Sequence, residues 1–192
     1  MKEKTLEQYR TEFKQKKLIT MPIAGTIVWA ILGVMALLIP AKQMVLPFYI
    51  GTGCIFYLAL FLSRFTGERL IAKSSEMNPF DALFLYTVVM SLLCFAIAIP
   101  FSLQDYSSVP LTIGVLSGLM WLPISWMIEH KVGTFHALTR TLGVTFAWFA
   151  FPEQRFVVIP FVIVAIYLIS IYFLHIRWQQ TTENSIGNHN FN

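Results

Sequence analysis

The sequence predicts an all-α integral membrane protein with six transmembrane helices and both termini in the cytoplasm. Of its 192 residues, 56% are hydrophobic and only 12% are charged, which lies outside the usual range of soluble proteins. Six apolar runs of roughly 18 to 22 residues can each cross a hydrocarbon core of about 30 Å as a helix. Eleven of the 14 Lys and Arg residues flank these runs on one side, and two flank them on the other. Because basic loops stay inside, the richer side is assigned to the cytoplasm.

Residues 1–17 form a basic amphipathic segment ahead of the first apolar run. Thr5 and Gln8 have the spacing of a capping box, and Leu6, Tyr9 and Phe13 recur at helical spacing. Two interpretations are open: a short helix on the membrane surface with its aromatic residues in the interface, or a solvated basic tail that only sets the orientation. The basic end also suits a surface of anionic lipid at the cytoplasmic face. The basic residues are Lys2, Lys4, Arg10, Lys14, Lys16 and Lys17.

A single transmembrane domain is expected over residues 18–178, which leaves no length for a separate soluble domain. Its first run is longer than a signal-peptide core and has no small-x-small exit, so it should remain as an anchor. The third run begins at Asn78-Pro79-Phe80-Asp81, with Asn as the cap, Pro at the first helical position and Asp in the first turn. Asp81 is interpreted as part of this cap only. The expected helices are 18–39, 44–63, 79–100, 109–128, 134–151 and 156–176.

Three tandem helical hairpins, all entering from the cytoplasm, are a further interpretation of the six runs. Pro47-Phe48 and Pro160-Phe161 are each followed by a basic residue 17 positions after the proline. The alternative is that prolines are common at helix ends and that apolar sequences resemble one another by chance. After the last run, residues 179–192 are polar and rich in Asn, and they are expected to form a disordered tail.

The fifth expected helix, 134–151, is the most polar of the six. It carries His136, Arg140 and four threonines, so it should face other helices rather than lipid on all sides. Small residues recur at four-residue spacing along it, and the fourth helix offers a matching surface of glycines. Close packing of these two helices is therefore predicted. The residues predicted to pack are Gly114 and Gly118 in the fourth helix and Thr139, Gly143 and Ala147 in the fifth.

Glu129, His136 and Arg140 form the candidate binding site, with Trp126 beside them. His136 and Arg140 are four residues apart and share a helix face. Arg140 begins about 9 Å inside the span, and three interpretations are open. Its side chain extends back to the cytoplasmic interface, or it pairs with Glu129 and lines a polar cavity, or it forms a purely structural buried ion pair. Pro123 should kink the fourth helix, and a cavity is expected beside that kink.

The sequence contains no motif for catalysis or for cofactor binding. It has no phosphate-binding glycine loop and no H-E-x-x-H, C-x-x-C or G-x-S-x-G pattern. Cys54 and Cys94 lie in apolar runs and are interpreted as small core residues rather than as a disulfide or a metal site. We therefore expect a protein that is not an enzyme and that has no metal, no cofactor and no nucleic-acid partner.

Three short segments carry a resemblance to a known family. Leu62-Ser63-Arg64, Asn78-Pro79 and Leu122-Pro123-Ile124-Ser125-Trp126 resemble a family of small six-span bacterial membrane proteins of unknown function. The resemblance covers most of residues 5–176. It implies a bacterial cytoplasmic (inner) membrane and the same six-span arrangement, and it implies no activity.

Two classes of function fit these features. The first is a small-solute or ion transporter or a channel-like protein with a polar pathway beside the fifth helix; the kink, the small-residue surfaces and the Glu129, His136 and Arg140 group favour it. The second is a non-catalytic membrane subunit, assembly factor or envelope-stress protein, favoured because no run carries a central acidic residue. A homo-oligomer is compatible with both. An intramembrane enzyme that acts on lipid comes third, since no acid/base pair is visible.

Overall fold

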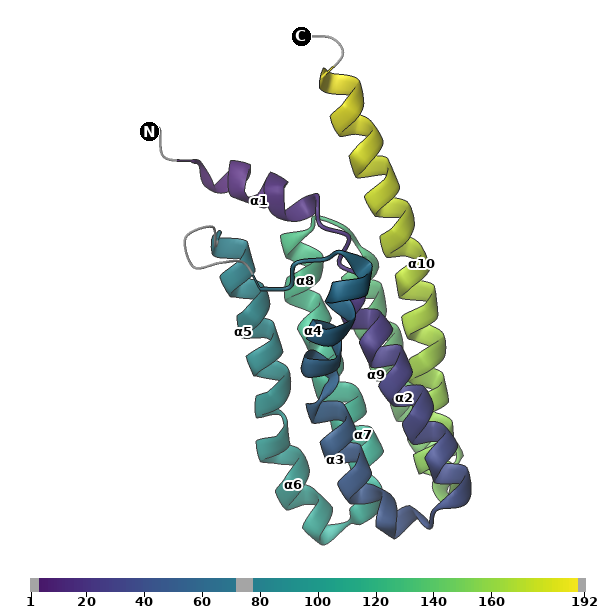
Figure 1. Cartoon of the computed structure of the whole chain (residues 1–192). Helices are drawn as coiled ribbons and strands as arrows, with labels where there is room; N and C mark the ends of the chain where they lie inside the picture. The colour runs from purple at the N-terminus through teal and green to yellow at the C-terminus, as the bar shows by residue number, and fades with distance from the viewer. Residues whose placement is uncertain (1–3, 72–77, 190–192) are drawn as a thin grey trace.

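The computed structural model describes residues 4–71 and 78–189, with the side chains of residues 182–189 excepted. Within these ranges the chain forms α-helices and short 3-10 helices that assemble into an elongated bundle (Figure 1). The all-α prediction is confirmed for this part of the chain. Lys2 and Lys73, two of the residues counted in the basic bias, and residues 190–192 of the expected tail lie outside the described residues.

Helices follow one another along the chain with short connections. The α-helices are α1 (Leu6–Lys14), α2 (Thr20–Leu38), α3 (Val45–Gly53), α4 (Ile55–Thr66), α5 (Pro79–Leu93), α6 (Phe95–Gln104), α7 (Val109–Leu116), α8 (Trp121–Met127), α9 (Val132–Ala150) and α10 (Arg155–His189). The 3-10 helices are η1 (Ala41–Met44), η2 (Tyr106–Ser108), η3 (Ser117–Met120) and η4 (Pro152–Gln154).

The long helices run up and down the bundle, and the first and the last of them lie together (Figure 1). α2 packs along α10, α10 packs along α9, and α9 packs on α7 and α8. Large apolar side chains from several helices fill the core between them, among them Trp29, Phe48, Ile159 and Ile163. This arrangement places α9, the most polar of the long helices, in contact with several others. Its opposite side, with Leu142 and Phe146, is exposed and apolar.

Four helical stretches are long and apolar enough to cross a membrane by length and composition. They are Thr20–Leu38, Pro79–Gln104, Tyr106–Met127 and Pro152–Thr181. α3 and α4 together would form a fifth, bent by 46°. α9 has 19 residues but is not among them, because its polar side chains lower its hydropathy. The described part of the chain therefore has four or five helices of membrane-spanning character.

Three of the stretches that sequence predicts as continuous helices are interrupted near their middle. α3 gives way to α4 at Cys54, α5 gives way to α6 at Cys94, and α7 continues into α8 through η3. Pro123 accounts for the third interruption, because it has no N–H for the carbonyl group of Leu119 and its ring crowds that carbonyl. The preceding turn adopts the tighter 3-10 form over Ser117–Met120. The distortion predicted for Pro123 is thus present in the turn before it.

α1 lies across the end of the bundle that carries both chain termini (Figure 1). The Thr5 hydroxyl accepts a hydrogen bond from the Gln8 N–H, and the Gln8 side chain accepts one from the Thr5 N–H, so the predicted capping box is present. Phe13 is 1% exposed and packs against Phe80 and Phe84 of α5. Neither interpretation of residues 1–17, the helix in the membrane interface or the solvated tail, predicted that the aromatic side of α1 packs against protein.

α5 and α10 each differ from expectation in one respect. The Asn78 side chain caps α5 as predicted, by accepting hydrogen bonds from N–H groups of the first turn. Asp81 does more than cap, because its carboxylate pairs with Lys16 in the link between α1 and α2. α10 continues to His189 where a disordered tail was expected. Residues 179–186 contain no Pro or Gly, so nothing in them ends a helix that is already formed.

Candidate binding site

Arg140 lies in the interior of the bundle, on the face of α9 that packs against α7. It is only 1% exposed. Its guanidinium donates three hydrogen bonds: from Nε to the carbonyl oxygen of Gly114 (2.7 Å), from Nη1 to the hydroxyl of Tyr167 (3.0 Å) and from Nη2 to the hydroxyl of Ser117 (2.9 Å). The side chain is enclosed by other helices and does not reach the surface of the bundle, so the first interpretation of Arg140 is wrong.

The end of α7 supplies the carbonyl group that Arg140 binds. Gly114 lies in the last turn of α7, next to the change to η3, and its carbonyl oxygen accepts the bond from Arg140 Nε. Gly118 gives the side chain room, since a Cβ there would come within 2.8 Å of the Cδ of Arg140. The irregular turn before Pro123 therefore provides an acceptor, and the glycine provides the space beside it.

Within the described residues, no carboxylate forms an ion pair with Arg140. The aromatic rings of Trp29 on α2 and Tyr167 on α10 stabilise part of its positive charge instead, with ring centroids 5.3 and 5.4 Å from the Cζ of Arg140. A guanidinium has five N–H groups, and three of them donate to protein in the bonds given above. Both ion-pair interpretations of Arg140 are therefore wrong for this part of the chain.

His136 lies one turn before Arg140 and is fully buried. Its ring stacks on Trp121 with a centroid distance of 4.1 Å, and Nδ1 lies 2.8 Å from the hydroxyl of Ser170 on α10. The Ser170 hydroxyl donates to the carbonyl oxygen of Ile166 (2.8 Å). Because a serine has one hydroxyl proton, Ser170 must accept from His136, which places a proton on Nδ1. Nε2 has no hydrogen-bond partner among the described residues.

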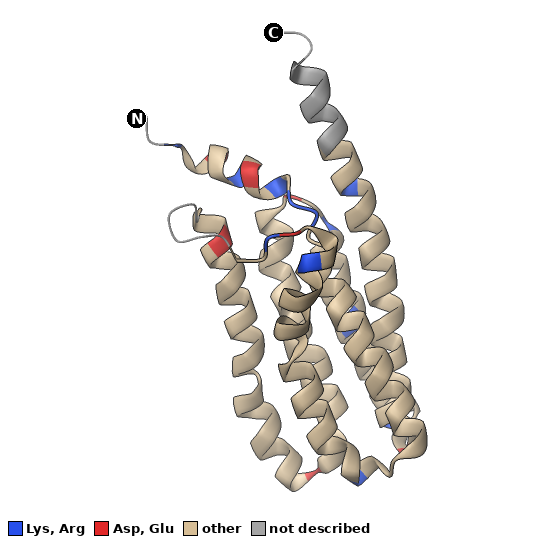
Figure 2. Ribbon diagram, in the orientation of Figure 1, with Lys and Arg blue, Asp and Glu red and all other residues tan. Residues whose placement is uncertain are grey.

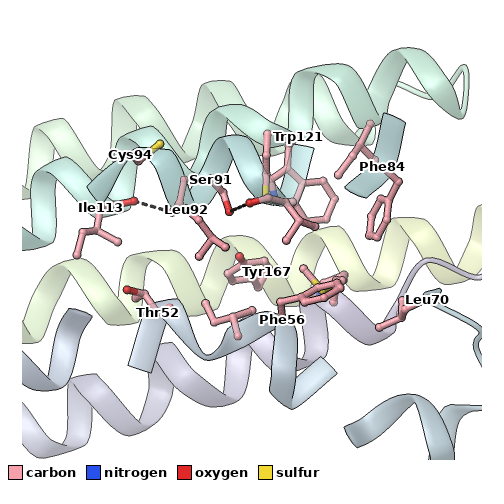
Figure 3. A pocket seen from close by; sticks show the side chains of 18 of the residues that line it. Thr52, Phe56, Leu70, Phe84, Ser91, Leu92, Cys94, Ile113, Trp121 and Tyr167 are labelled. Atoms are coloured by element: carbon pink, nitrogen blue, oxygen red, sulfur yellow. Dashed lines mark hydrogen bonds between the residues drawn. The ribbon is translucent and has the colours of Figure 1, made fainter. Parts of the chain in front are cut away.

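An apolar cavity lies next to Arg140 and His136, and side chains that contact these two residues form part of its wall. The space between its walls measures about 970 Å³, part of it open to the outside. Ser117, Trp121 and Tyr167 belong both to the wall and to the contacts of Arg140 and His136. Figure 3 shows Trp121 and Tyr167 among the side chains that border the space. The buried charge of Arg140 therefore lies directly behind part of the cavity wall.

The cavity is located where the three helical stretches are interrupted. Thr52 lies just before the turn at Cys54, and Ser91 and Cys94 lie at the second interruption. These three side chains line the cavity (Figure 3). Ser117, the first residue of η3, lines it as well. Irregular backbone inside a membrane is tolerated where it is buried in protein or lines a cavity. Interrupted helices at mid-depth are also typical of substrate sites in transporters.

The hydroxyl of Tyr167 gives the cavity wall a hydrogen-bond donor. It accepts a hydrogen bond from Arg140, and its own proton has no acceptor among the described residues. The Ser117 hydroxyl differs, because it donates to the carbonyl oxygen of Ile113 (2.6 Å). A bond accepted from a charged group polarises the phenol and strengthens its O–H as a donor. The wall can therefore hold an oxygen atom of a ligand whose body is apolar.

Glu129 and Trp126 lie apart from His136 and Arg140, at the end of the bundle covered by α1. The Glu129 carboxylate accepts hydrogen bonds from Arg10 (3.0 Å) and Lys14 (2.6 Å). The bond from Lys14 lowers the pKa of Glu129 below its ordinary value, and the charge of Arg10 adds to the effect. Trp126 is 58% exposed and has the Arg10 guanidinium 4.4 Å from its ring centroid. Figure 2 shows Lys and Arg gathered with acidic residues at this end. The four predicted site residues therefore belong to two separate places.

The glycines of the fourth expected helix do face α9. A Cβ on Gly114 would lie 3.1 Å from Val144, and Gly118 faces Arg140. Ala147, which was predicted to pack, is buried on the same side of α9. The close approach that sequence predicts for these two helices is thus present through Gly114 and Gly118.

Thr139 and Gly143 do not take part in that contact. The Thr139 hydroxyl donates to the carbonyl oxygen of Phe135 in its own helix (2.6 Å), and a Cβ on Gly143 would meet Val162 of α10 at 3.1 Å. The four-residue spacing is longer than the 3.6-residue period of a helix, so these positions turn away from α7. Gly133, which the sequence analysis did not consider, makes a closer approach: a Cβ there would overlap the carbonyl oxygen of Trp121.

Ser117, Tyr167 and Ser170 were not predicted as site residues from sequence. Ser117 lies between the two glycines of the fourth helix, and Tyr167 and Ser170 are polar residues in the middle of the last apolar run. A search for hydroxyl groups far from the ends of apolar runs would have found all three, because such groups must bond within the protein.

The comparisons with known proteins identify a family. The sequence model of a family of unknown function, DUF7010, matches residues 6–177. The chain belongs to this family. The DUF7010 region includes α1, the apolar cavity, His136 and Arg140, so the candidate site lies inside the shared region. No curated protein and no solved structure matches the chain. Membership in DUF7010 and the apolar helices are compatible with a membrane protein of unassigned activity.

Proposed function

We propose that the protein binds a small, largely apolar solute in the cavity beside Tyr167 and moves it across a bacterial cytoplasmic membrane. The observation that carries this proposal is a cavity bordered by three interrupted helical stretches, with the Tyr167 hydroxyl on its wall and Arg140 behind it. The lining is mostly apolar and carries a few hydroxyl groups, which is typical of small-molecule sites. The solute carries at least one hydrogen-bond acceptor, since the wall offers a donor.

The proposal includes six membrane crossings arranged as three antiparallel hairpins. α3 with α4 is the bent second crossing, and α9 is the fifth. α9 can cross despite its polar residues because Arg140 and His136 are buried against other helices while Leu142 and Phe146 face outward. The basic residues near α1 then place both termini in the cytoplasm. That end also suits contact with anionic lipid.

The proposed role is binding and movement rather than catalysis. Among the described residues that line the cavity there is no carboxylate, imidazole or amine side chain. The polar side-chain groups at the wall are hydroxyls, a thiol and the indole N–H of Trp121, and the guanidinium behind them is already bonded to the protein. These groups can orient a ligand, whereas general acid/base chemistry usually needs a group that titrates near neutral pH.

Thermal unfolding in lipid nanodiscs with matched small molecules tests the proposal. Ketones of seven to ten carbons should raise the melting temperature of the wild-type protein more than alkanes of the same size, because the carbonyl oxygen can accept from Tyr167. Tyr167→Phe should remove the difference between ketones and alkanes. Ser91→Phe, which puts a ring into the cavity, should abolish both effects.

Ser102→Phe is the matched control for Ser91→Phe. Each serine lies in the apolar stretch Pro79–Gln104 and donates to the carbonyl group three residues before it, but of the two only Ser91 lines the cavity. Equal ketone responses in the two phenylalanine variants would contradict binding in this cavity. A protein that responds to no member of the panel would fit the alternative of a non-catalytic subunit or assembly factor.

A further inference from the structure

A second hollow, lined by charged as well as apolar side chains, lies at the α1 end of the bundle. Its space measures about 590 Å³, part of it open to the outside. The link between α1 and α2 forms one side, the segment after α4 forms another, and Trp178 of α10 completes it. We call it the vestibule. Its charged lining residues are Lys16, Lys17, Glu68 and Arg69.

Two leucines stand between the vestibule and the apolar cavity. Leu18 and Leu70 line both spaces, and no other described residue does so. Leu70 is buried beside Ala24 of α2 and Ala59 of α4. Leu18 has a φ of 58°, a left-handed conformation that is costly for a residue with a bulky side chain. The chain thus holds Leu18 in an unfavourable conformation at the point where its side chain separates the two spaces.

Lys16 is paired with Asp81 of α5, and Lys17 is a basic side chain without an ion pair among the described residues of the vestibule. The carboxylate of the vestibule, Glu68, accepts hydrogen bonds from the N–H groups of Ile19 (3.0 Å) and Thr20 (2.9 Å), at the start of α2. The positive end of that helix therefore offsets the charge of Glu68. Lys17 lies over the ring of Trp178, with its Nζ 4.4 Å from the centroid, and an aromatic ring leaves the charge of a lysine in place.

We propose that the solute is a small organic anion, that it passes through the vestibule, and that Leu18 and Leu70 must part to admit it. This inference rests on the proposed function and adds the charge of the solute and its route. Positive charge around a narrow opening raises the local concentration of anions and their rate of entry. Inside the cavity, the anionic group accepts a hydrogen bond from the hydroxyl of Tyr167, with the positive charge of Arg140 behind that hydroxyl.

Thiol labelling of Cys94 measures this route directly, because Cys94 lines the cavity and Cys54 can be replaced by serine. The purified protein in nanodiscs is treated with an anionic sulfonatoethyl or a cationic trimethylammonium methanethiosulfonate, and each rate is divided by the rate with a free thiol. We expect the anionic reagent to react about tenfold faster on this scale. Equal rates, a faster cationic reagent, or no labelling of Cys94 by either would overturn the proposal.

Two sets of variants then test the charge of the vestibule and the barrier formed by Leu18 separately. Lys17→Gln should reduce the preference for the anionic reagent by about twofold, whereas Lys42→Gln, at the opposite end of the bundle, should leave it unchanged. Leu18→Asn keeps a residue that accepts a left-handed backbone, removes the apolar side chain and should speed both reagents alike. Equal effects of Lys17→Gln and Lys42→Gln would overturn the proposal that anions enter through the vestibule. If neutral ketones bind while the anion preference is absent, the proposed function stands and this inference alone fails.

Discussion

Arg140 shows how a bundle of apolar helices accommodates a charge without a carboxylate. A carbonyl group, two hydroxyls and two aromatic rings surround the guanidinium, and each comes from an element other than α9. The planar, forked shape of the group matches this set, since each of its three nitrogens points at a different partner. Its charge then acts on the cavity through the hydroxyls that it binds.

Arg140→Lys should lower the stability of the protein although the charge is kept. A lysine has one ammonium group and cannot reach three separated acceptors, so at least one buried acceptor loses its partner, at a cost of about 1–3 kcal/mol. Chemical unfolding in detergent measures the change. Arg64→Lys, on the exposed end of α4, is the control and should be close to neutral. A neutral Arg140→Lys would contradict the described hydrogen bonds.

The lowered pKa of Glu129 predicts that the packing of α1 against the bundle depends on pH. This pKa is lowered in the folded protein by the hydrogen bond from Lys14 and by the charge of Arg10. A carboxyl with a lowered folded pKa stabilises the folded state above its unfolded pKa of about 4.3, and this stabilisation is lost as the pH falls through the folded pKa. Fluorescence of Trp126, which stacks against Arg10, should therefore change on acidification below about pH 4. Glu129→Gln should lack this acid-dependent change, and its persistence would assign the transition to another group.

At the scale of elements, glycine contacts and interruptions decide how the helices fit together. Gly133 brings the start of α9 against the backbone of α8, and Gly114 and Gly118 bring α9 against α7 and η3. The interruptions at Cys54, Cys94 and η3 leave space between the helices instead. Close contact on one side of the bundle and a cavity on the other follow from these few positions.

Gly133→Ala should destabilise the protein more than any other single glycine-to-alanine change among those described. The added Cβ would overlap a backbone oxygen of Trp121, which cannot move aside without shifting α8, and overpacking of this kind costs about 1–3 kcal/mol. Gly53→Ala is the matched control, because the nearest atom to its Cβ would be 3.8 Å away on Phe95. We expect that variant to unfold at the same or a higher temperature, since alanine favours helix. Similar melting temperatures for both variants would disprove the contact.

Local features were predictable from sequence, whereas distant partners were not. The Thr5 capping box, the Asn78 cap and the distortion before Pro123 depend on residues within a few positions of one another, and all three are present. The partners of Arg140 are 23 to 27 positions away, and Glu129 is held by Arg10, 119 positions away. Glu129 was the nearest carboxylate in sequence, but the bundle brings it to α1 instead.

At the scale of the whole molecule, the structure places the loops that sequence assigns to opposite sides at opposite ends. Gln43 lies in η1 at one end, and Thr181 lies near the other, where α1 is found (Figure 1). The distribution of Lys and Arg follows the same division (Figure 2). A single direction of insertion then decides which end meets the cytoplasm.

Single cysteines at Gln43 and Thr181 test that direction. With Cys54 and Cys94 replaced by serine, a thiol reagent that does not cross the membrane should label the cysteine at Gln43 in intact cells. The cysteine at Thr181 should be labelled only after the cells are opened. The reverse pattern would invert the orientation, and labelling of both in intact cells would show that the ends are not separated by a membrane.

The contact between α2 and α10 has a consequence for biosynthesis. The ribosome delivers α2 first among the long helices and α10 last, so α2 lacks this partner until nearly the whole chain has been made. Until then Gly25 and Gly33, which pack against Tyr167 and Phe161, have no covering partner. Glu129, which pairs with α1, and Asp81, which pairs with the link after α1, also emerge long after that helix. Chains truncated before α10 should therefore be degraded faster than the full chain in a pulse-chase measurement, because the first long helix to be made is among the last to be enclosed.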